Sequence, residues 1–254
     1  MKLNRVFELK RGAYTPIKSF RLQDELNPKI WTDFEIDKNV KKQLKTIAQD
    51  FYSENDIDAK IKDIILCGSL CNYNWSEKYS DFDLHIIIDF RDVDEDYDLV
   101  ENLCDLAKKV WNSQHRIRIK GYDVEVAIQD REIMLEEIED GKMGGVYSLT
   151  NDNWIKKPEK KVFKPNERLI KEKSKSIMTL IDEIELDSKE QDFNQLESRI
   201  KRTWKKIKDY RKSGLESESG EFSIGNLVFK LLRRNGYIDR FMQLRRELYD
   251  KQFK

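Results

Sequence analysis

The chain contains few of the residues that interrupt helices, form disulfides or bind zinc. Its 254 residues include 10 glycines and 4 prolines, which leaves long stretches free to form helices. It also has only 3 cysteines and 2 histidines. Because Cys67, Cys71 and Cys104 are odd in number and lie in apolar sequence, we expect reduced core thiols and no structural zinc.

A net charge and long apolar runs are lacking as well. The 48 Lys and Arg residues balance 48 Asp and Glu residues, so the overall charge gives no reason to expect a nucleic-acid partner. No stretch approaches the roughly 18–20 apolar residues that cross a bilayer, and residues 1–5 begin no apolar signal region. These absences predict a cytoplasmic protein with no membrane partner.

Charged residues make up 38% of the chain, which is typical of helices with long solvated faces. Apolar residues at helical spacing predict helices over 37–55, 97–113 and 131–140, with Asp37 as the N-cap of the first. The apolar stripe of the second helix consists of Leu99, Leu103, Leu106, Val110 and Trp111.

Short apolar or alternating runs between these helices predict strands. We expect strands over 63–67 and 82–90, a pair over 116–120 and 122–129 around a glycine, and a last edge strand over 146–149. The 122–129 run alternates cleanly between two faces. Val124, Val126 and Ile128 take one face, and Asp123, Glu125, Ala127 and Gln129 take the other.

The composition changes to Lys, Pro and Glu around 156–164, where we place a domain boundary. Beyond it the sequence predicts helices over 166–184, 191–212, 223–234 and 238–252. The expected fold is α+β, a small mixed β-sheet with flanking helices followed by a C-terminal helical bundle. Its parts are an arm that packs on the core (1–36), the sheet core (37–157) and the helical domain (158–254).

The most informative motif joins two of the predicted strands. Gly68-Ser69 follows the first strand, and Asp81 and Asp83 stand at the head of the next. In an extended strand residues i and i+2 point the same way, ~6.5–7 Å apart, so both carboxylates can reach into one space. Paired carboxylates can hold divalent metals, and a glycine turn can hold phosphate, which together suggest phosphoryl or nucleotidyl transfer.

A third carboxylate is expected from a neighbouring strand. Asp123 and Glu125 both lie on the polar face of such a strand, and the spacing alone does not choose between them. With three carboxylates the site can hold two Mg²⁺ or Mn²⁺ ions. Two such ions can polarise an α-phosphate, stabilise departing pyrophosphate and activate a hydroxyl.

Phosphate binding requires a backbone cradle and positive charge. Gly68 lets the backbone approach a phosphate closely, and a helix starting at Ser69 would direct its positive end at the anion. The cation candidates for a triphosphate are Lys78, Lys156, Lys157, Lys160 and Lys161.

Several nearby residues have both a structural and a functional interpretation. His85 continues the Asp81 and Asp83 face, as a hydrogen-bonded structural residue or as a ligand. The stretch 72–75 can shape a nucleotide pocket or cap the turn, and Trp154 can be a core residue or a base-stacking platform. The basic run 199–208 can be a solvated face or an RNA groove.

Gly68-Ser69, then Asp81-Phe82-Asp83, then an acidic residue on a later strand resemble the signature of the DNA polymerase beta-type nucleotidyltransferase superfamily. More narrowly, the chain is similar to uncharacterised nucleotidyltransferase-like proteins of tailed bacteriophages, which implies a host-cell cytoplasmic location if a phage encodes it. The segments that carry this narrower resemblance are 26–31, 68–89, 124–126, 145–149 and 220–223.

The resemblance implies a nucleotidyltransferase that binds a nucleoside triphosphate such as ATP. It assigns Glu125 as the third metal ligand, although members usually carry Asp there, and keeps Asp123 as the substitute. Asp81, Asp83 and Glu125 would then be catalytic and metal-binding, and Gly68, Ser69 and Lys78 would bind the nucleotide. The hydroxyl acceptor could be RNA, a nucleotide, a protein or a small molecule. The alternatives are a catalytically silent nucleotide-binding module, with a signal-sequestering or antitoxin-like role, and an RNA-binding protein.

Overall fold

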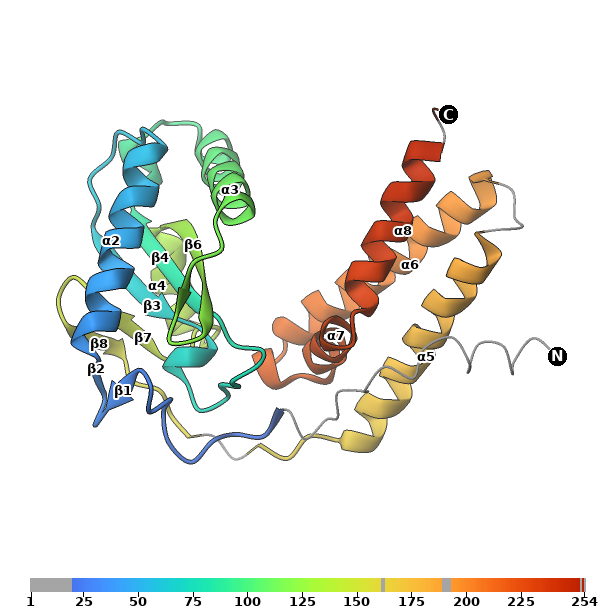
Figure 1. Ribbon diagram of the computed structural model, residues 1–254, viewed down its shortest axis with the longest axis horizontal. Coiled ribbons are helices and arrows are strands. Elements are labelled where there is room, and N and C mark those ends of the chain that lie inside the picture. The colour runs from blue at the N-terminus through green and yellow to red at the C-terminus, as the bar shows by residue number, and fades with distance from the viewer. Residues whose placement is uncertain (1–19, 161–162, 189–192, 252, 254) are drawn as a thin grey trace. The chain divides into compact units, whose positions relative to one another are not determined.

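The computed structural model describes residues 20–160, 163–188, 193–251 and 253. These residues fall into two compact units, a sheet unit (20–160) and a helical unit (163–253). The first unit is built on a mixed six-stranded sheet with helices, and four α-helices make up the described part of the second (Figure 1). The predicted α+β class is therefore confirmed.

The sheet has the strand order β5-β6-β4-β3-β7-β8. Strand β4 runs antiparallel to β3 and parallel to β6, which makes the sheet mixed. The three central strands contain most of its buried residues. The strands are β3 (Asp63–Cys67), β4 (Phe82–Ile88), β5 (Arg118–Ile119), β6 (Tyr122–Asp130), β7 (Val146–Ser148) and β8 (Asn153–Lys156).

The prediction that 146–149 forms an edge strand is wrong. Strand β7 pairs with β3 on one side and with β8 on the other, so β8 closes the sheet. Residues of β8 alternate between exposed and half-buried, and its side chains include Asn153 and Lys156. A strand that is only half-buried at an edge needs no apolar run, which is why the sequence pattern does not reveal it.

Helices cover both faces of this sheet. On one face α2 (Lys38–Glu54) and α3 (Tyr97–Gln114) share a core with the even-numbered residues of β4, among them Leu84 and Ile86. On the other face α4 (Arg131–Glu139) packs Met134 against Ile87. Because α4 covers the Ile87 end of β4, the Asp83 end of that face stays half-buried.

The N-cap predicted for α2 is confirmed. The Asp37 carboxylate Oδ1 accepts the backbone N–H groups of Asn39 and Val40 at 2.8 and 3.0 Å. These two bonds satisfy donors that have no partner inside the helix, so the cap fixes where α2 begins.

The apolar stripe of α3 lies on the surface. Leu99, Leu103, Leu106 and Val110 are between 45% and 59% exposed. The helix instead buries the neighbouring face, which consists of Val100, Cys104, Ala107 and Trp111. Trp111 packs edge-on against Phe51 of α2, with ring centroids 5.4 Å apart. Such a row of exposed leucines is larger than the scattered apolar residues usual at a protein surface.

Residues 20–36 pack against the sheet unit, whereas 1–19 lie outside the described residues. This segment contains two short strands, β1 (Trp31–Thr32) and β2 (Glu35–Ile36), which form a hairpin. The fully buried Asn27 donates to the Tyr122 hydroxyl at 2.6 Å. The Trp31 indole N–H donates to the Leu70 carbonyl at 2.7 Å, which ties the segment to the turn that follows β3.

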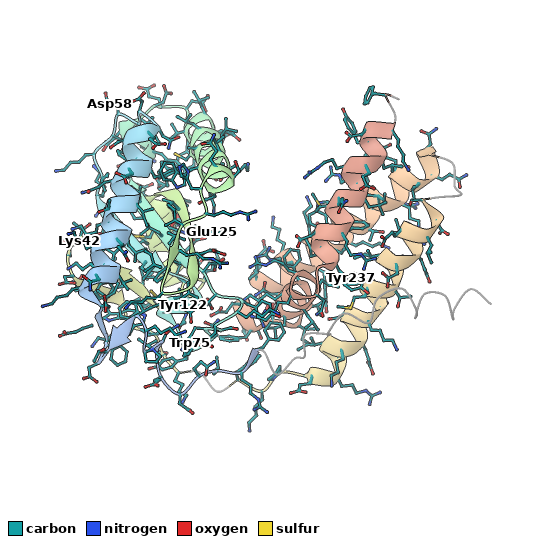
Figure 2. All side chains as sticks on the ribbon, viewed as in Figure 1. Lys42, Asp58, Trp75, Tyr122, Glu125 and Tyr237 are labelled. Atoms are coloured by element: carbon teal, nitrogen blue, oxygen red, sulfur yellow. The ribbon has the colours of Figure 1, made fainter. Side chains whose placement is uncertain are left out.

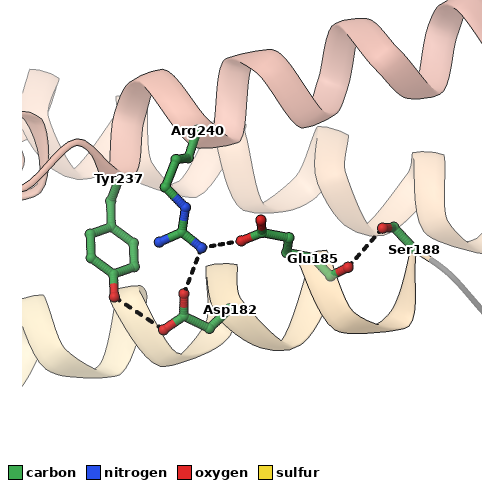
Figure 3. A network of polar contacts seen from close by, with 5 residues as sticks. All are labelled: Asp182, Glu185, Ser188, Tyr237 and Arg240. Carbon is green, nitrogen blue, oxygen red and sulfur yellow. Dashed lines mark hydrogen bonds and ion pairs between the residues drawn. The ribbon is translucent and has the colours of Figure 1, made fainter. Parts of the chain in front are cut away.

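An apolar interior and a polar network between α5 and α8 hold the helices of the second unit together. Arg240 of α8 donates to Asp182 and to Glu185 of α5, and the Tyr237 hydroxyl donates to Asp182 at 3.1 Å (Figure 3). Buried apolar residues line its helices, for example Ile181, Ile200 and Leu231. The helices are α5 (Glu167–Asp187), α6 (Phe193–Leu215), α7 (Ile224–Arg234) and α8 (Tyr237–Lys251).

The three cysteines are free and buried, as expected from their surroundings. Burial, helped by the Asp83 carboxylate, raises the pKa of the Cys67 thiol well above its ordinary value. Such thiols stay protonated and unreactive. Across the described residues, none of the helices combines the length and the apolar character needed to cross a bilayer.

Candidate functional site

The end of β3 and the start of β4 form the centre of the candidate site. Cys67 and Asp83 are register partners in this antiparallel pair, so Gly68 leaves the sheet directly beside Asp83. A Cβ added to Gly68 would lie 1.7 Å from Asp83 Oδ2. Gly68 also has a φ of +72°, a conformation that side chains disfavour. Only glycine therefore allows the turn and the carboxylate to be this close.

Asp81 and Asp83 share a face, as the spacing predicts. Phe82, which lies between them, is fully buried in the opposite face, and both aspartates are half-buried. Asp81 lies immediately before β4, and Asp83 lies within it. Alternation along the extended chain directs the two carboxylates to the same side of the sheet.

Glu125 is the register partner of Asp83. Strands β4 and β6 are parallel, and the pairing of Asp83 with Glu125 places their Cα atoms side by side; Glu125 is labelled in Figure 2. Neighbouring strands lie ~4.8 Å apart, so these two carboxylates project from adjacent points of one face. Glu125 is exposed, whereas the flanking Val124 and Val126 are buried. Asp81, Asp83 and Glu125 thus lie on one face of the sheet, at the start of β4 and beside it on β6.

Asp123 has a different environment. It pairs with Arg118 of β5, and its carboxylate accepts from the Arg118 guanidinium at 2.5 Å. This hydrogen bond and the arginine charge hold the pKa of Asp123 below its ordinary value. Strand β5 lies on the side of β6 away from β4, so Asp123 is bound by an arginine at the sheet edge. The geometry favours Glu125 over Asp123 as the partner of Asp83.

The two halves of the motif are bonded to each other. The Ser69 and Ser80 hydroxyls are 2.7 Å apart, and the Ser76 backbone N–H donates to Ser80 Oγ at 2.9 Å. These bonds fix the Gly-Ser turn relative to Asp81, the neighbour of Ser80. The sequence pattern does not single out Ser80, because the role of this residue depends on how the loop 72–80 folds back.

The turn after Gly68 is only one turn of 3₁₀-helix, η2 (Ser69–Cys71). This agrees with the expected short helix or turn, but a single turn is too short to direct a helix macrodipole at a phosphate. Any phosphate contact would therefore come from single backbone N–H groups and the Ser69 hydroxyl rather than from a helix macrodipole.

Two glycines after α4, Gly144 and Gly145, pack closely against this turn and the residue that follows it. A Cβ at Gly145 would lie 1.9 Å from the Cys71 carbonyl oxygen, and one at Gly144 would lie 2.0 Å from Asn72 Nδ2. A side chain at position 145 would displace the backbone of η2, and one at position 144 would displace the Asn72 side chain. The Gly-Gly pair is thus part of the architecture of the candidate site.

The residues of 72–75 mostly serve to anchor the chain before β1. The Trp75 indole N–H donates to the Glu25 carbonyl at 2.9 Å, and the Tyr73 carbonyl accepts from the Gln23 backbone N–H at 2.6 Å (Figure 2). Trp154 likewise stacks beside Trp31, with centroids 4.7 Å apart, in an aromatic cluster. These contacts favour the structural interpretation of both tryptophans.

The lysines expected near the triphosphate have diverse positions. Lys78 is exposed, with its ammonium 5.2 Å from the Tyr79 ring centroid. Lys156 donates to the Ile138 carbonyl, Lys157 lies over the Phe34 ring, and Lys160 pairs with Asp24. Lys161 lies outside the described residues. Three of the five lysines therefore have structural contacts of their own.

Lys108 of α3 is a cation that the sequence pattern did not single out. It is half-buried, and its charge lowers the pKa of His85 and opposes the burial-driven rise in the pKa of Cys67. Both affected residues lie in the part of the sheet that carries Asp83. A lysine on a charge-rich helix has no recognisable signal in the sequence, because only the fold brings it near the site.

His85 is held by a chain of hydrogen bonds on the acid face. Gln129 donates through Nε2 to Glu137 at 2.8 Å, so its Oε1 faces His85 Nδ1 at 2.7 Å. Burial lowers the pKa of His85 below its ordinary value, the Gln129 bond opposes this, and the Lys108 charge adds to it. The imidazole is therefore neutral, with its proton on Nδ1.

The donor chemistry of the three carboxylates suits Mg²⁺ or Mn²⁺, which prefer hard oxygen ligands. Among the described residues, no three His, Cys, Asp or Glu side chains are grouped so that they could hold a metal ion. The backbone places Asp81, Asp83 and Glu125 on one face, and side-chain rotation would be required to bring their oxygens together. A hollow of about 600 Å³ elsewhere in the sheet unit is lined by lysines of α2, not by these acids.

Comparisons with protein-family models, with curated proteins and with solved structures find no match for this chain.

Proposed function

We propose that the protein is a metal-dependent nucleotidyltransferase that transfers NMP from a nucleoside triphosphate to a hydroxyl and releases pyrophosphate. One observation carries the proposal: Asp83 lies between Gly68 and Glu125, in register with β6 and in contact with the turn that follows β3. The acid face and the glycine turn are thus parts of one site. The resemblance of Gly68-Ser69 and Asp81-Phe82-Asp83 to the polymerase beta-type superfamily supports the same chemistry.

The residues that would hold Mg²⁺ are Asp81, Asp83 and Glu125. When bound, the metal would supply Lewis-acid stabilisation of the developing phosphate charge and a lowered pKa for the attacking hydroxyl. Gly68 leaves room for the Asp83 carboxylate itself, whose Oδ2 lies where a Cβ would otherwise be. The Ser69 and Ser80 pair would keep the turn at a constant distance from the carboxylates.

Lys108 is the cation that we place beside the phosphates. It acts electrostatically on the acid face, as its effect on His85 indicates. A lysine here would offset the four negative charges of a nucleoside triphosphate and orient it toward Asp83. His85, bound to Gln129 through Nδ1, is a neutral hydrogen-bonding group at the same face rather than a competing cation.

The direct test is to incubate the full chain with each of the four NTPs and Mg²⁺ or Mn²⁺, and to identify products by mass spectrometry. Wild type should yield pyrophosphate and a nucleotidylated acceptor, and the Asp81→Ala/Asp83→Ala double variant should not. Product formation that survives the double change would exclude the proposed mechanism. Tight NTP binding with no product under any condition would favour the silent binding module instead.

A further inference from the structure

Four cationic side chains gather where α6 and α7 meet in the helical unit. Arg211 belongs to α6, and Lys230, Arg233 and Arg234 occupy one turn of α7; we name this set the α6–α7 basic cluster. The Arg211 guanidinium carbon lies 4.2 Å from the centroid of the Phe229 ring. A cation–π contact of this kind holds the guanidinium in place against α7.

Two glycines bring the helices close enough to build this cluster. A Cβ at Gly225 of α7 would lie 2.2 Å from the Tyr210 carbonyl oxygen of α6. A Cβ at Gly214 would lie 2.5 Å from Ser223 Oγ. Because Arg211 adjoins Tyr210 in the sequence, this close crossing places Arg211 against the same turns of α7. The cluster is therefore fixed by packing of the backbone.

The cluster has more positive than negative charge. Lys230 is 3.8 Å from a Glu221 carboxylate oxygen, and among the described residues the charges of Glu221 and of three arginines act on it. Burial, with the repulsion of the arginines added, lowers the pKa of Lys230 in spite of Glu221. Burial and then Arg233 lower the pKa of Arg211 in the same way. Repulsion among these like charges destabilises the protein when no anion is bound.

Arg240 of α8 has a structural role in the same unit, and two carboxylates compensate its charge. Burial lowers the pKa of Arg240, but its hydrogen bonds to Glu185 and Asp182 outweigh burial and raise it (Figure 3). Both arginines have an enclosed Nε without a hydrogen bond, but Arg211, in contrast to Arg240, makes no ion pair with a carboxylate in the part of the chain that the structure describes. A half-buried arginine without a carboxylate partner is costly, unless a ligand supplies the missing negative charge.

We propose that the α6–α7 basic cluster binds a compact phosphate-rich anion, that is, a small molecule with two or more adjacent phosphates. Positions 230, 233 and 234 share one face of one helical turn, so their side chains converge on a small volume. Arginine and lysine together match the geometry and the charge of neighbouring phosphate groups. An extended nucleic acid strand spreads its charge along its axis and would use a longer row of cations.

This inference concerns binding alone and does not depend on the acid face of the sheet unit. The experiment is calorimetric titration of the full chain with sodium tripolyphosphate in low-salt, metal-free buffer. The wild type should bind in a saturable manner, and Arg233→Gln should weaken binding about tenfold or more, because a bond to a charged group is lost. The matched control is Lys205→Gln, which removes an equal charge from an exposed position of α6.

Thermal unfolding separates an anion site from a structural role. Without anion, Arg233→Gln should unfold at the wild-type temperature or above it, because like-charge repulsion falls. Tripolyphosphate should then raise the unfolding temperature of the wild type and of Lys205→Gln more than that of Arg233→Gln.

Three results would overturn the proposal. The first is no saturable binding by the wild type. The second is an equal loss of affinity in Arg233→Gln and Lys205→Gln, which indicates non-specific attraction. The third is tighter binding of a 5′-hydroxyl RNA oligonucleotide than of tripolyphosphate, which assigns the cluster to an RNA backbone instead. Arg233→Gln should lower the affinity for tripolyphosphate to the same extent in the wild type and in an Asp83→Asn background, which separates the cluster from the proposed transferase site.

Discussion

Asp83 and Glu125 stand side by side on parallel strands, and their carboxylates project from the same face of the sheet. If both hold the catalytic metal, Glu125→Gln should lower the rate of pyrophosphate release by about 100-fold or more, because a neutral amide is a poor ligand for Mg²⁺. The matched control is Asp123→Asn on the same strand, whose carboxylate is bound by Arg118. The control should keep most of the activity. A larger loss in Asp123→Asn than in Glu125→Gln would reverse the assignment.

Gly68→Ala tests the close contact between the turn and Asp83. The added methyl group would overlap Asp83 Oδ2, and the residue would be held at a φ that favours glycine. We expect a loss of about 1–3 kcal/mol in the free energy of unfolding, measured by urea denaturation. Activity should fall further than stability, even at temperatures where the variant is folded. The control, Gly121→Ala, has a positive φ but open space around its Cβ, and should lose stability without an equal loss of activity.

Lys108→Met tests the cation that we propose to lie beside the triphosphate. If the lysine binds the triphosphate, the variant should raise the KM for NTP by about tenfold, because a charge-assisted contact is lost. The neighbouring Lys109, which pairs with Asp105 on the surface of α3, provides the matched control. Equal KM values for Lys108→Met and Lys109→Met would remove Lys108 from the site.

Asp37 gives a pH-dependent prediction for the fold. The backbone N–H of Val40 is the main cause that lowers the pKa of this carboxyl, and Asn39 and Lys120 contribute against burial. A folded pKa below the unfolded value of 3.8 means that the stabilisation is present above that pH and is lost as the pH falls through the folded pKa. Asp37→Ala should therefore unfold at a lower temperature than the wild type at pH 7. Thermal scans of the two proteins should converge at acidic pH, and a constant difference at all pH values would contradict the capping role.

Local signals predicted most of the secondary structure. Asp37 marks the start of α2, and the alternation of Val124, Val126 and Ile128 marks β6, because caps and strand periodicity act over a few residues. Strand β8 was not predicted, because a half-exposed edge strand has little apolar pattern in its sequence.

The orientation of α3 could not be read from the sequence. Leu99, Leu103 and Leu106 form the most apolar face of this helix, yet the fold buries the face with Cys104 and Ala107. That buried face also contains Val100 and the large Trp111, so which face packs depends on the shape of the sheet and of α2. Periodicity identifies a helix but does not identify which of two neighbouring faces is covered.

The candidate site could be predicted in part. The spacing of Asp81 and Asp83 and the glycine at 68 were sufficient to nominate the acids and the turn. Strand pairing was needed to place Glu125 beside Asp83 and Asp123 beside Arg118. Ser80 and Lys108 became visible only in three dimensions, because their partners are distant in the sequence or lie on another element.

The most direct test of the proposed chemistry is pyrophosphate release from NTPs in the presence of Mg²⁺, measured for the wild type and for Asp83→Asn. Asp83 contacts the glycine turn and neighbours Glu125, so it lies at the centre of the candidate site. Asparagine is the neutral isostere of aspartate and therefore removes the charge while it keeps the shape of the side chain. We predict release by the wild type and a loss of about 10²–10³-fold or more in the variant. Equal rates of release by the two proteins would contradict the account.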